Sequence, residues 1–448
     1  MPLFQTPPSS ICILRLSAIG DCCHALALVR VIQREWPETR ITWITGKIEA
    51  TLFADLPGVE VIPFDKSKGW RGYRELWRTL KGRKFDALLH LQAALRASIA
   101  TLGIRAKIKL GFDKARANDG QWLFTNHQVP SPDSPHVLDG FLAFAKELGI
   151  RDLTPDWQLP ISAEHQAWAR EKIDGKPTLL ICAAASKAFK NWTAAGYAAL
   201  ADHAANKGFQ VYLCGGPAKL ERDLAADIQR LSQSKPVDLV GQTNLKQLLA
   251  LIKEASLVLA PDTGPTHMAT LAGTPVIGLY AHHNPARTGP YLCRDYVVSV
   301  YQELIEQETG KPLAELGWRT RLKDPDAMAK ISRERVIAAF DRLCTDKHLL
   351  PTQGNSEIPS PEAGITCWPL PAPKGTIAAD VGYAPAASYE YFDRLEYDSG
   401  RFFIRPHLLT FAAFTTSRLK NFPRFASDCL PFGHMTAASA TTKTRVIA

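Results

Sequence analysis

Short apolar runs typical of buried strands alternate with amphipathic helical segments in two separate stretches of this chain. In the first stretch the runs are ICILRL (11–16), RITWIT (40–45), VEVIPF (59–64), FDALLHL (85–91) and AKIKLGF (106–112). The intervening segments are long enough for helices, the first running from Asp21 to Trp36 and stopped by Pro37. Repetition of strand, helix and strand predicts a parallel, doubly wound sheet.

The alternation lapses between about residues 125 and 177 and then resumes. The lapse is rich in Pro, Asp and His and holds one helical piece, residues 137–150, that could bridge two lobes. Later strand-like runs lie at 178–184, 209–215, 237–241, 256–262 and 274–280, with helical segments at 193–207, 217–233, 244–254 and 264–272. We therefore expect two Rossmann-like α/β domains, residues 1–165 and 166–349, whose parallel sheets face each other across a cleft.

The segment 350–448 has a different character. It begins rich in Pro, Gly, Ser and Ala, and no strand–helix alternation follows. We expect a poorly ordered C-terminal extension and assign it no function.

Charge and composition limit the partners of the chain. Hydrophobic residues make up 46% and charged residues 22%, as in soluble globular proteins, and no apolar run is long enough to span a membrane. The N-terminus lacks the pattern of a signal peptide, so we expect a cytoplasmic protein whose nine cysteines are thiols without a catalytic role. A net charge of +9 favours anionic partners: nucleic acid, an anionic membrane surface or a phosphorylated substrate.

The loops after strands are where a ligand site is expected in such sheets. After the first strand, Gly20 permits close approach of the backbone to a ligand, and Asp21 opens a helix. Asp21 is either a helix cap or a general base that accepts a proton from an acceptor hydroxyl.

The segment APDTGPTHMATLAGTPVIGLY (260–280) follows the same plan. Asp262 ends a strand, and Thr263, Gly264 and Pro265 form the turn into a helix whose free N–H groups suit a diphosphate. His267 lies in the first helical turn, where it is either structural or faces the same ligand.

A third loop carries a hydroxyl and an ammonium group. Ser186 and Lys190 follow the strand at 178–184, and this pairing suits phosphate oxygens and a departing diphosphate. A solvated loop lysine is the alternative. The tight turn CGGP (214–217) follows the next strand, with Glu221 in the helix after it.

The segment 66–84 holds eight basic residues and one acid. If it is helical, the Trp, Tyr and Leu side chains form a packing stripe and the arginines line the other faces. These arginines form either a solvated cationic face or a docking surface for a phosphorylated, membrane-borne acceptor. The predicted acceptor-binding residues are Lys68, Arg71, Arg74 and Arg116.

No metal site is predicted. Asp324-Pro325-Asp326 matches the DxD string of metal-dependent glycosyltransferases, but it precedes a helical run and is interpreted as a helix cap. Thr45-Gly46-Lys47 lacks the upstream glycine of a P-loop, and His282-His283 has no third ligand nearby.

Four motifs in this order resemble glycosyltransferase family 9, the lipopolysaccharide heptosyltransferases. They are the N-terminal strand–SxxGD–helix, Ser-x-x-x-Lys-x-Trp (186–192), Asp-Thr-Gly-Pro-x-His (262–267) and GTPVIGLYAHHNPARTGPY (273–291). The resemblance covers roughly residues 10 to 345. Some members carry two adjacent threonines where this chain has Ala185 and Ser186, so one phosphate-facing hydroxyl is missing.

The resemblance implies a GT-B fold and inversion at the anomeric carbon without a metal or cofactor. It implies transfer of heptose from ADP-heptose to the Kdo-lipid A inner core of lipopolysaccharide, by a monomer at the cytoplasmic face of the inner membrane with no nucleic-acid partner. Asp21 falls on the catalytic base, Lys190 on the diphosphate-binding lysine and Asp262 on the carboxylate that contacts the donor sugar. The other implied donor-binding residues are Ser186, Glu221, Thr263, Gly264, Pro265 and His267.

Three alternatives stay open. The chain could use a different nucleotide sugar, or be a sugar-nucleotide epimerase or hydrolase on the same fold, which needs no separate acceptor. A basic nucleic-acid-binding protein is the non-enzymatic alternative, although no nucleic-acid motif is present.

Overall fold

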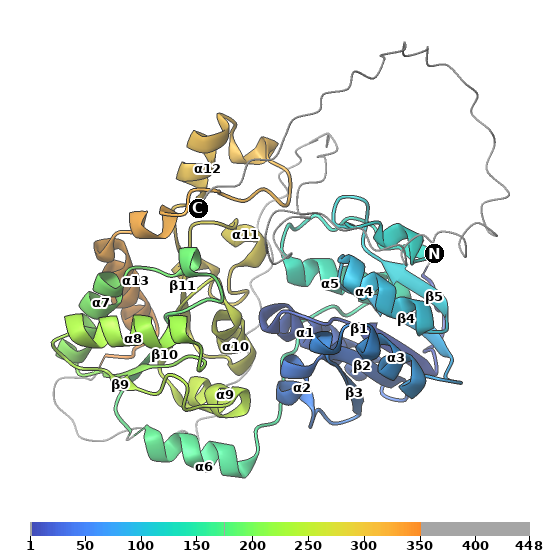
Figure 1. Ribbon diagram of the computed structural model, residues 1–448, viewed down its shortest axis with the longest axis horizontal. Coiled ribbons are helices and arrows are strands. Elements are labelled where there is room, and N and C mark those ends of the chain that lie inside the picture. Colours follow the sequence, from blue (N-terminus) through green and yellow to red (C-terminus); the bar gives the residue numbers. More distant parts are fainter. Residues whose placement is uncertain (1, 174, 351–448) are drawn as a thin grey trace, which may run out of the picture. The chain divides into compact units, whose positions relative to one another are not determined.

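The computed structural model describes residues 2–173 and 175–350, which fall within one compact unit. Two six-stranded sheets form its frame (Figure 1). The strands of the first are β1 (Ser10–Leu14), β2 (Arg40–Gly46), β3 (Val59–Phe64), β4 (Phe85–His90), β5 (Ala106–Gly111) and β6 (His127–Gln128). Those of the second are β7 (Thr178–Ile181), β8 (Gln210–Leu213), β9 (Val237–Asp238), β10 (Leu257–Pro261), β11 (Val276–Tyr280) and β12 (Val298–Ser299).

All pairings in both sheets are parallel. The strand orders are β3-β2-β1-β4-β5-β6 and β12-β11-β10-β7-β8-β9, so each sheet has the order of a Rossmann domain. The order reverses between β1 and β4 in the first sheet and between β7 and β10 in the second. Ligands of such sheets bind at this switch point, outside the carboxyl ends of the strands.

The first sheet is covered on both faces. Its helices are α1 (Ile19–Glu35), α2 (Lys47–Phe53), α3 (Trp70–Thr79), α4 (Leu95–Ala100) and α5 (Val137–Leu148). Alternate residues of β1 enter different apolar clusters: Ile11 and Ile13 pack with α1 and α5, whereas Cys12 and Leu14 pack with α3 and α4. This period of two is what a buried strand between two helical layers requires.

The second sheet is covered in the same way. Its helices are α6 (Ala163–Lys172), α7 (Ala194–Asn206), α8 (Lys219–Leu231), α9 (Leu245–Glu254), α10 (Gly264–Ala272), α11 (Pro285–Thr288), α12 (Tyr301–Thr309) and α13 (Arg333–Asp346). Val258 packs with α9 and α10, and Leu257 and Leu259 pack with α7 and α13.

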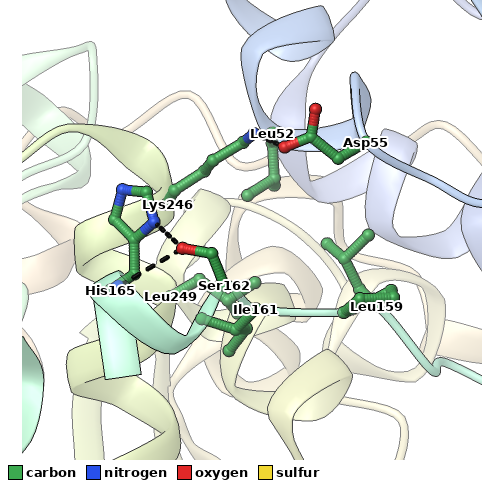
Figure 2. A pocket seen from close by; sticks show the side chains of 9 residues that line it. Leu52, Asp55, Leu159, Ile161, Ser162, His165, Lys246 and Leu249 are labelled. Atoms are coloured by element: carbon green, nitrogen blue, oxygen red, sulfur yellow. Dashed lines mark hydrogen bonds and ion pairs between the residues drawn. The ribbon is translucent and has the colours of Figure 1, made fainter. Parts of the chain in front are cut away.

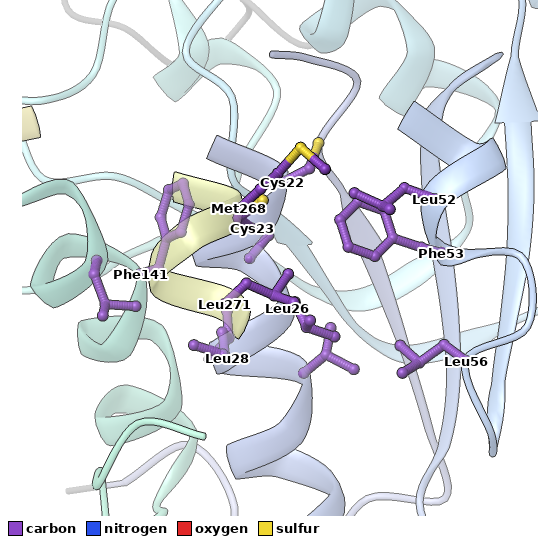
Figure 3. Close-up of a cluster of buried hydrophobic side chains, with 14 of the residues drawn as sticks. Cys22, Cys23, Leu26, Leu28, Leu52, Phe53, Leu56, Phe141, Met268 and Leu271 are labelled. Atoms are coloured by element: carbon purple, nitrogen blue, oxygen red, sulfur yellow. The ribbon is translucent and has the colours of Figure 1, made fainter. Parts of the chain in front are cut away.

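One apolar cluster runs from the first sheet to the second through α1 and α10. Figure 3 shows Met268 and Leu271 of α10 beside Leu26 and Leu28 of α1. All four side chains are buried. The two helices that follow the switch-point strands β1 and β10 are therefore held together by hydrophobic packing.

Gly20 of α1 lies against the ring of His267 in α10. A Cβ atom at residue 20 would lie 3.1 Å from Nε2 of His267 and would overlap its Cδ2 atom. Gly264, at the start of α10, is also close to α1, because a Cβ there would lie 3.3 Å from Cβ of Ile19. The two helix N-termini thus approach each other where side chains are smallest.

Most predicted elements are confirmed, and the differences have physical causes. The observed strands and helices follow the predicted runs, and α1 begins two residues earlier than expected. The two-residue strands β6 and β12 were missed, because a pair of residues carries no hydrophobic period. The helices α6 and α12 were also missed, so residues 125–177 hold a second helix besides the predicted one. Only Ala169 of α6, and Tyr301 and Ile305 of α12, are buried, so neither helix shows a clear apolar stripe. Trp70 of α3 is 42% exposed, but its ring packs on those of Tyr73 and Trp77, as the predicted stripe requires.

Some predictions are not settled by the fold. The extension predicted for 350–448 lies outside the described residues apart from residue 350. The domain boundaries near 165 and 349 stay predictions, although α6 packs on α9 of the second half. None of the helices in the described ranges is both long and apolar enough to cross a bilayer.

Substitution of Gly20 by Ala tests the contact between α1 and α10. We expect the free energy of unfolding to fall by about 1–3 kcal/mol, because the added methyl group overpacks the ring of His267. Urea denaturation monitored by circular dichroism measures the change. Gly264→Ala, with its looser 3.3 Å contact, is the matched control and should cost less. Equal costs at both positions would contradict the close approach at Gly20.

Candidate functional site

Asp21 is held at the carboxyl end of β1 by an arginine. It lies in the first turn of α1, and its carboxylate forms an ion pair with Arg15. Arg15 is fixed in turn, because its Nη1 donates a 2.6 Å hydrogen bond to the carbonyl of Leu91 after β4. The N-cap residue of α1 is Ala18, so Asp21 lies inside the first turn and is not the cap; its side chain is 33% exposed.

His267 is within electrostatic range of two carboxylates that follow strands of different sheets. Its ring is buried in α10, where burial lowers its pKa while the charges of Asp262 and Asp21 oppose that shift. The pKa of His267 thus depends on the charges of both Asp21 after β1 and Asp262 after β10.

A row of rings continues from His267 into the first domain. The centroid of the His24 ring lies 4.7 Å from that of His267 and 5.2 Å from that of His136, and both pairs pack edge to face. His136 Nε2 lies 2.9 Å from the carbonyl of Gly289, and its ring contacts Tyr291. Burial holds the pKa of His24 well below its ordinary value and lowers that of His136 to about 4. The row is therefore uncharged at neutral pH.

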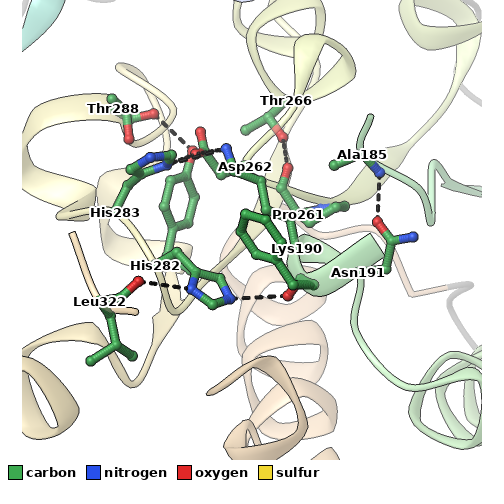
Figure 4. Close-up of polar contacts among 12 residues, drawn as sticks. Ala185, Lys190, Asn191, Pro261, Asp262, Thr266, His282, His283, Thr288 and Leu322 are labelled. Carbon is green, nitrogen blue, oxygen red and sulfur yellow. Dashed lines mark hydrogen bonds and ion pairs between the residues drawn. The ribbon is translucent and has the colours of Figure 1, made fainter. Parts of the chain in front are cut away.

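Lys190 and Asp262 meet at the switch point of the second sheet (Figure 4). Lys190 follows β7 in a short 3₁₀ turn, Asp262 follows β10, and Lys190 Nζ lies 3.0 Å from Asp262 Oδ2. Burial alone would raise the pKa of Asp262. The hydrogen bond from His283 and the positive charge of Lys190 oppose the effect of burial, and that pKa lies well below its ordinary value.

The remaining predicted donor residues surround this pair in two loops. Thr263 is the N-cap residue of α10 without a side-chain capping bond, and Pro265 lies in the first turn. Ser186 is exposed in the loop after β7. At the start of α10, Pro265 has no N–H and the N–H of Thr266 donates a 3.2 Å hydrogen bond to the carbonyl of Thr263. The N–H of Gly264 is the group that a helix start leaves without a partner inside the helix.

Glu221 has a local partner. It lies in the first turn of α8, and its carboxylate accepts a hydrogen bond from the backbone N–H of Gly216. One oxygen of Glu221 is thus used in shaping the Gly215–Gly216 turn. Contact with a ribose stays a prediction and would involve the other oxygen.

The predicted acceptor-binding residues fall into two groups. Arg71 and Arg74 are exposed on α3, and Lys68 just before it pairs with Glu75 at 2.7 Å. Arg116 is instead buried, with its guanidinium bound to Asp113. An acceptor could use Arg116 only if this ion pair opened.

No group of three or more potential metal ligands occurs among the described residues. Asp324 accepts a hydrogen bond from the N–H of Asp326 and pairs with Lys330, which fits a local turn rather than a metal site. The cap of the following helix α13 is Ser332 and not the DxD string, because a 3₁₀ turn intervenes.

A cavity away from these residues lies between α2, α9 and the chain entering α6 (Figure 2). Ser162 there caps α6 through the N–H of His165, and Lys246 forms an ion pair with Asp55. None of the predicted site residues lines it, and its polar groups are already paired with one another.

The family follows from sequence similarity. Residues 73–317, more than half of the chain, match glycosyltransferase family 9 (heptosyltransferase). The chain is also 50% identical over 344 residues to the lipopolysaccharide core heptosyltransferase OpsX of Haemophilus influenzae, a match that covers 77% of this chain and 99% of that protein. This chain belongs to glycosyltransferase family 9.

Solved structures support the fold of this glycosyltransferase. A family 9 glycosyltransferase from Veillonella parvula superposes with a TM-score of 0.62 at 21% identity, covering 75% of this chain and 97% of the other. The E. coli ADP-heptose lps heptosyltransferase II gives 0.56 at 19% identity, covering 76% and 99%. The predicted GT-B architecture is therefore confirmed.

Sequence reasoning missed two side chains of the glycosyltransferase that touch the predicted site. Arg15 was treated only as part of a strand, although its position six residues before Asp21 spans the turn. His283 lies inside the motif 273–291, but it was weighed only as a metal ligand and given no role. Its place in the loop after β11, the strand next to β10, is the signal that could have found it.

Proposed function

We propose that this glycosyltransferase transfers heptose from ADP-heptose to the Kdo-lipid A inner core of lipopolysaccharide, with inversion and without a metal or cofactor. The observation that carries the proposal is that Asp21, Lys190 and Asp262 each follow a strand that flanks a switch point. The ring of His267 packs against Gly20, the residue before Asp21. Similarity to OpsX and to an enzyme named for ADP-heptose supports the choice of sugar and donor.

The donor would be bound by the second sheet. Lys190 and the N-terminus of α10 would hold the diphosphate, because an ammonium group and free N–H groups both stabilise phosphate oxygens. Asp262 would accept hydrogen bonds from sugar hydroxyls, and Glu221 would contact the ribose. Ser186, Thr263, Gly264, Pro265 and His267 would complete the donor loops.

The reaction would be a single displacement. Asp21 Oδ1 would take the proton of the acceptor hydroxyl while Arg15 holds the other carboxylate oxygen. The acceptor oxygen would bond to the anomeric carbon as the bond from that carbon to the diphosphate oxygen breaks. Lys190 would stabilise the negative charge that develops on the leaving diphosphate.

Asp21→Asn tests the general base. We expect kcat to fall by about 10²–10⁴-fold, because the amide cannot accept the proton, while the dissociation constant for ADP stays unchanged. Steady-state kinetics and calorimetry measure the two quantities. Asp152→Asn, which changes an exposed carboxylate paired with Arg34, is the matched control. Near-normal kcat in Asp21→Asn would refute the assignment.

The donor is tested by offering ADP-heptose, UDP-glucose, UDP-N-acetylglucosamine and GDP-mannose with Kdo-lipid A and reading the product by mass. We expect only ADP-heptose to add a sugar to the acceptor. Transfer from another donor would refute the donor assignment. Consumption of a donor without acceptor would favour the epimerase or hydrolase alternative.

We also propose that the enzyme works as a monomer at the cytoplasmic face of the inner membrane, without nucleic acid. The phosphorylated acceptor is membrane-borne, and Lys68, Arg71 and Arg74 present positive charge on or beside α3. Arg116 would join them only after release from Asp113. Charges of this kind attract a protein to anionic lipids by about 1 kcal/mol each.

Co-sedimentation with phosphatidylglycerol vesicles tests this surface. We expect the double variant Arg71→Glu, Arg74→Glu to lose at least about tenfold in vesicle binding, since four units of charge are removed. The control reverses Arg230 and Arg333, two exposed arginines of the second domain. An equal loss in the control, or a salt-sensitive shift of labelled RNA by the wild type, would contradict the proposal.

A further inference from the structure

His283 joins the two charged groups of the predicted donor site, although no sequence motif assigned it there. It follows β11, the strand that pairs with β10, so its ring lies beside the carboxylate after β10. Its Nδ1 bonds to Asp262 Oδ2 and lies 3.2 Å from Lys190 Nζ. Lys190 and His283 therefore converge on one oxygen atom of Asp262 (Figure 4).

The chemistry of the three groups fixes which atom donates. A lysine ammonium only donates hydrogen bonds and a carboxylate only accepts them. The close contact of Nδ1 with Asp262 is thus a bond from Nδ1–H to the carboxylate, and Nδ1 cannot also accept from Lys190. Only 13% of the His283 side chain is exposed, and this burial lowers its pKa. The ring is therefore a neutral hydrogen-bond donor.

The neighbouring histidine has a different task. The ring nitrogens of His282 lie 3.0 Å from the carbonyl of Phe189 and 3.2 Å from that of Leu322. His282 therefore fastens the turn that carries Lys190, whereas His283 contacts the charged groups themselves.

Because Lys190 and His283 both donate to Asp262 Oδ2, the free energy needed to move one of them away depends on whether the other is present. Asp262 is 16% exposed, and a largely buried carboxylate that loses its only cation is strongly destabilised. With His283 in place, Asp262 keeps a hydrogen bond when Lys190 leaves. Without His283, Lys190 is the one of these two donors that remains, and Asp262 loses it when Lys190 moves away.

We propose that His283 is a positioning residue for donor binding, which holds Asp262 so that Lys190 can turn from this carboxylate to the diphosphate of a nucleoside diphosphate. The inference rests on the proposed function of Lys190 and Asp262. It adds that the affinity for the diphosphate group depends on a side chain that does not touch it.

Calorimetric titration of the full-length protein with ADP, and separately with adenosine, tests the proposal. We expect His283→Ala to weaken ADP binding by about 10- to 100-fold, the usual effect of losing a hydrogen bond to a charged group. Adenosine binding should not change, because adenosine has no phosphate to draw Lys190 away. A general distortion of the site would weaken both ligands.

His283→Asn is the conservative variant, because its amide nitrogen can take the place of Nδ1–H without titrating. We expect it to bind ADP within about threefold of wild type. His127→Ala removes an exposed histidine from β6 and is the matched control. In a Lys190→Met background, replacement of His283 by Ala should have little further effect on ADP binding, since the ammonium is already gone.

Three results would overturn the inference: normal ADP binding by His283→Ala, equal weakening of ADP and adenosine, or an undiminished effect in the Lys190→Met background. Failure of the proposed donor has a different signature. A wild-type protein that binds UDP or GDP but not ADP would refute ADP-heptose, and the same variants would then be titrated with that nucleotide. Binding of none of the three would overturn both proposals.

Discussion

Every strand in both sheets points the same way within its sheet, and this polarity determines where chemistry can occur. Because the carboxyl ends of parallel strands share one edge, loops far apart in the sequence meet there. Asp21 follows β1, Lys190 follows β7 and Asp262 follows β10, and each of these strands flanks a switch point. The apolar contact between α1 and α10 then joins the two edges, so that His267 senses a carboxylate from each.

The charged groups at these edges are mutually compensated before any ligand binds. Arg15 occupies one oxygen of Asp21, and Lys190 and His283 share one oxygen of Asp262. Around the largely buried Asp262 this compensation lowers the pKa of the carboxyl group. It also means that a ligand must exchange existing partners rather than find free charges, which favours a ligand that brings its own negative charge.

Sequence patterns were sufficient for both sheets apart from the two-residue edge strands β6 and β12, and for the loops of the predicted site. The period of two in the strands, the helical segments and the turn residues at 262–265 all act over a few residues, and the resemblance supplied the roles. The partner of Asp21, the place of His283 and the burial of Arg116 depend on contacts between distant segments. Such contacts are set by packing and leave no local period in the sequence. For this reason Arg116 was predicted to bind an acceptor although it is buried, and His283 was given no role.

Gly20 and His267 are 247 positions apart, yet they share one small volume. The choice of residue at either position therefore limits the other. A side chain at position 20 is accommodated without loss of stability only if position 267 becomes smaller, and a smaller residue there would remove the imidazole ring. If the proposed chemistry needs the imidazole at position 267, packing of α1 against α10 requires glycine at position 20, although Gly20 has no chemical role of its own. Substitutions at the two positions should therefore occur together or not at all.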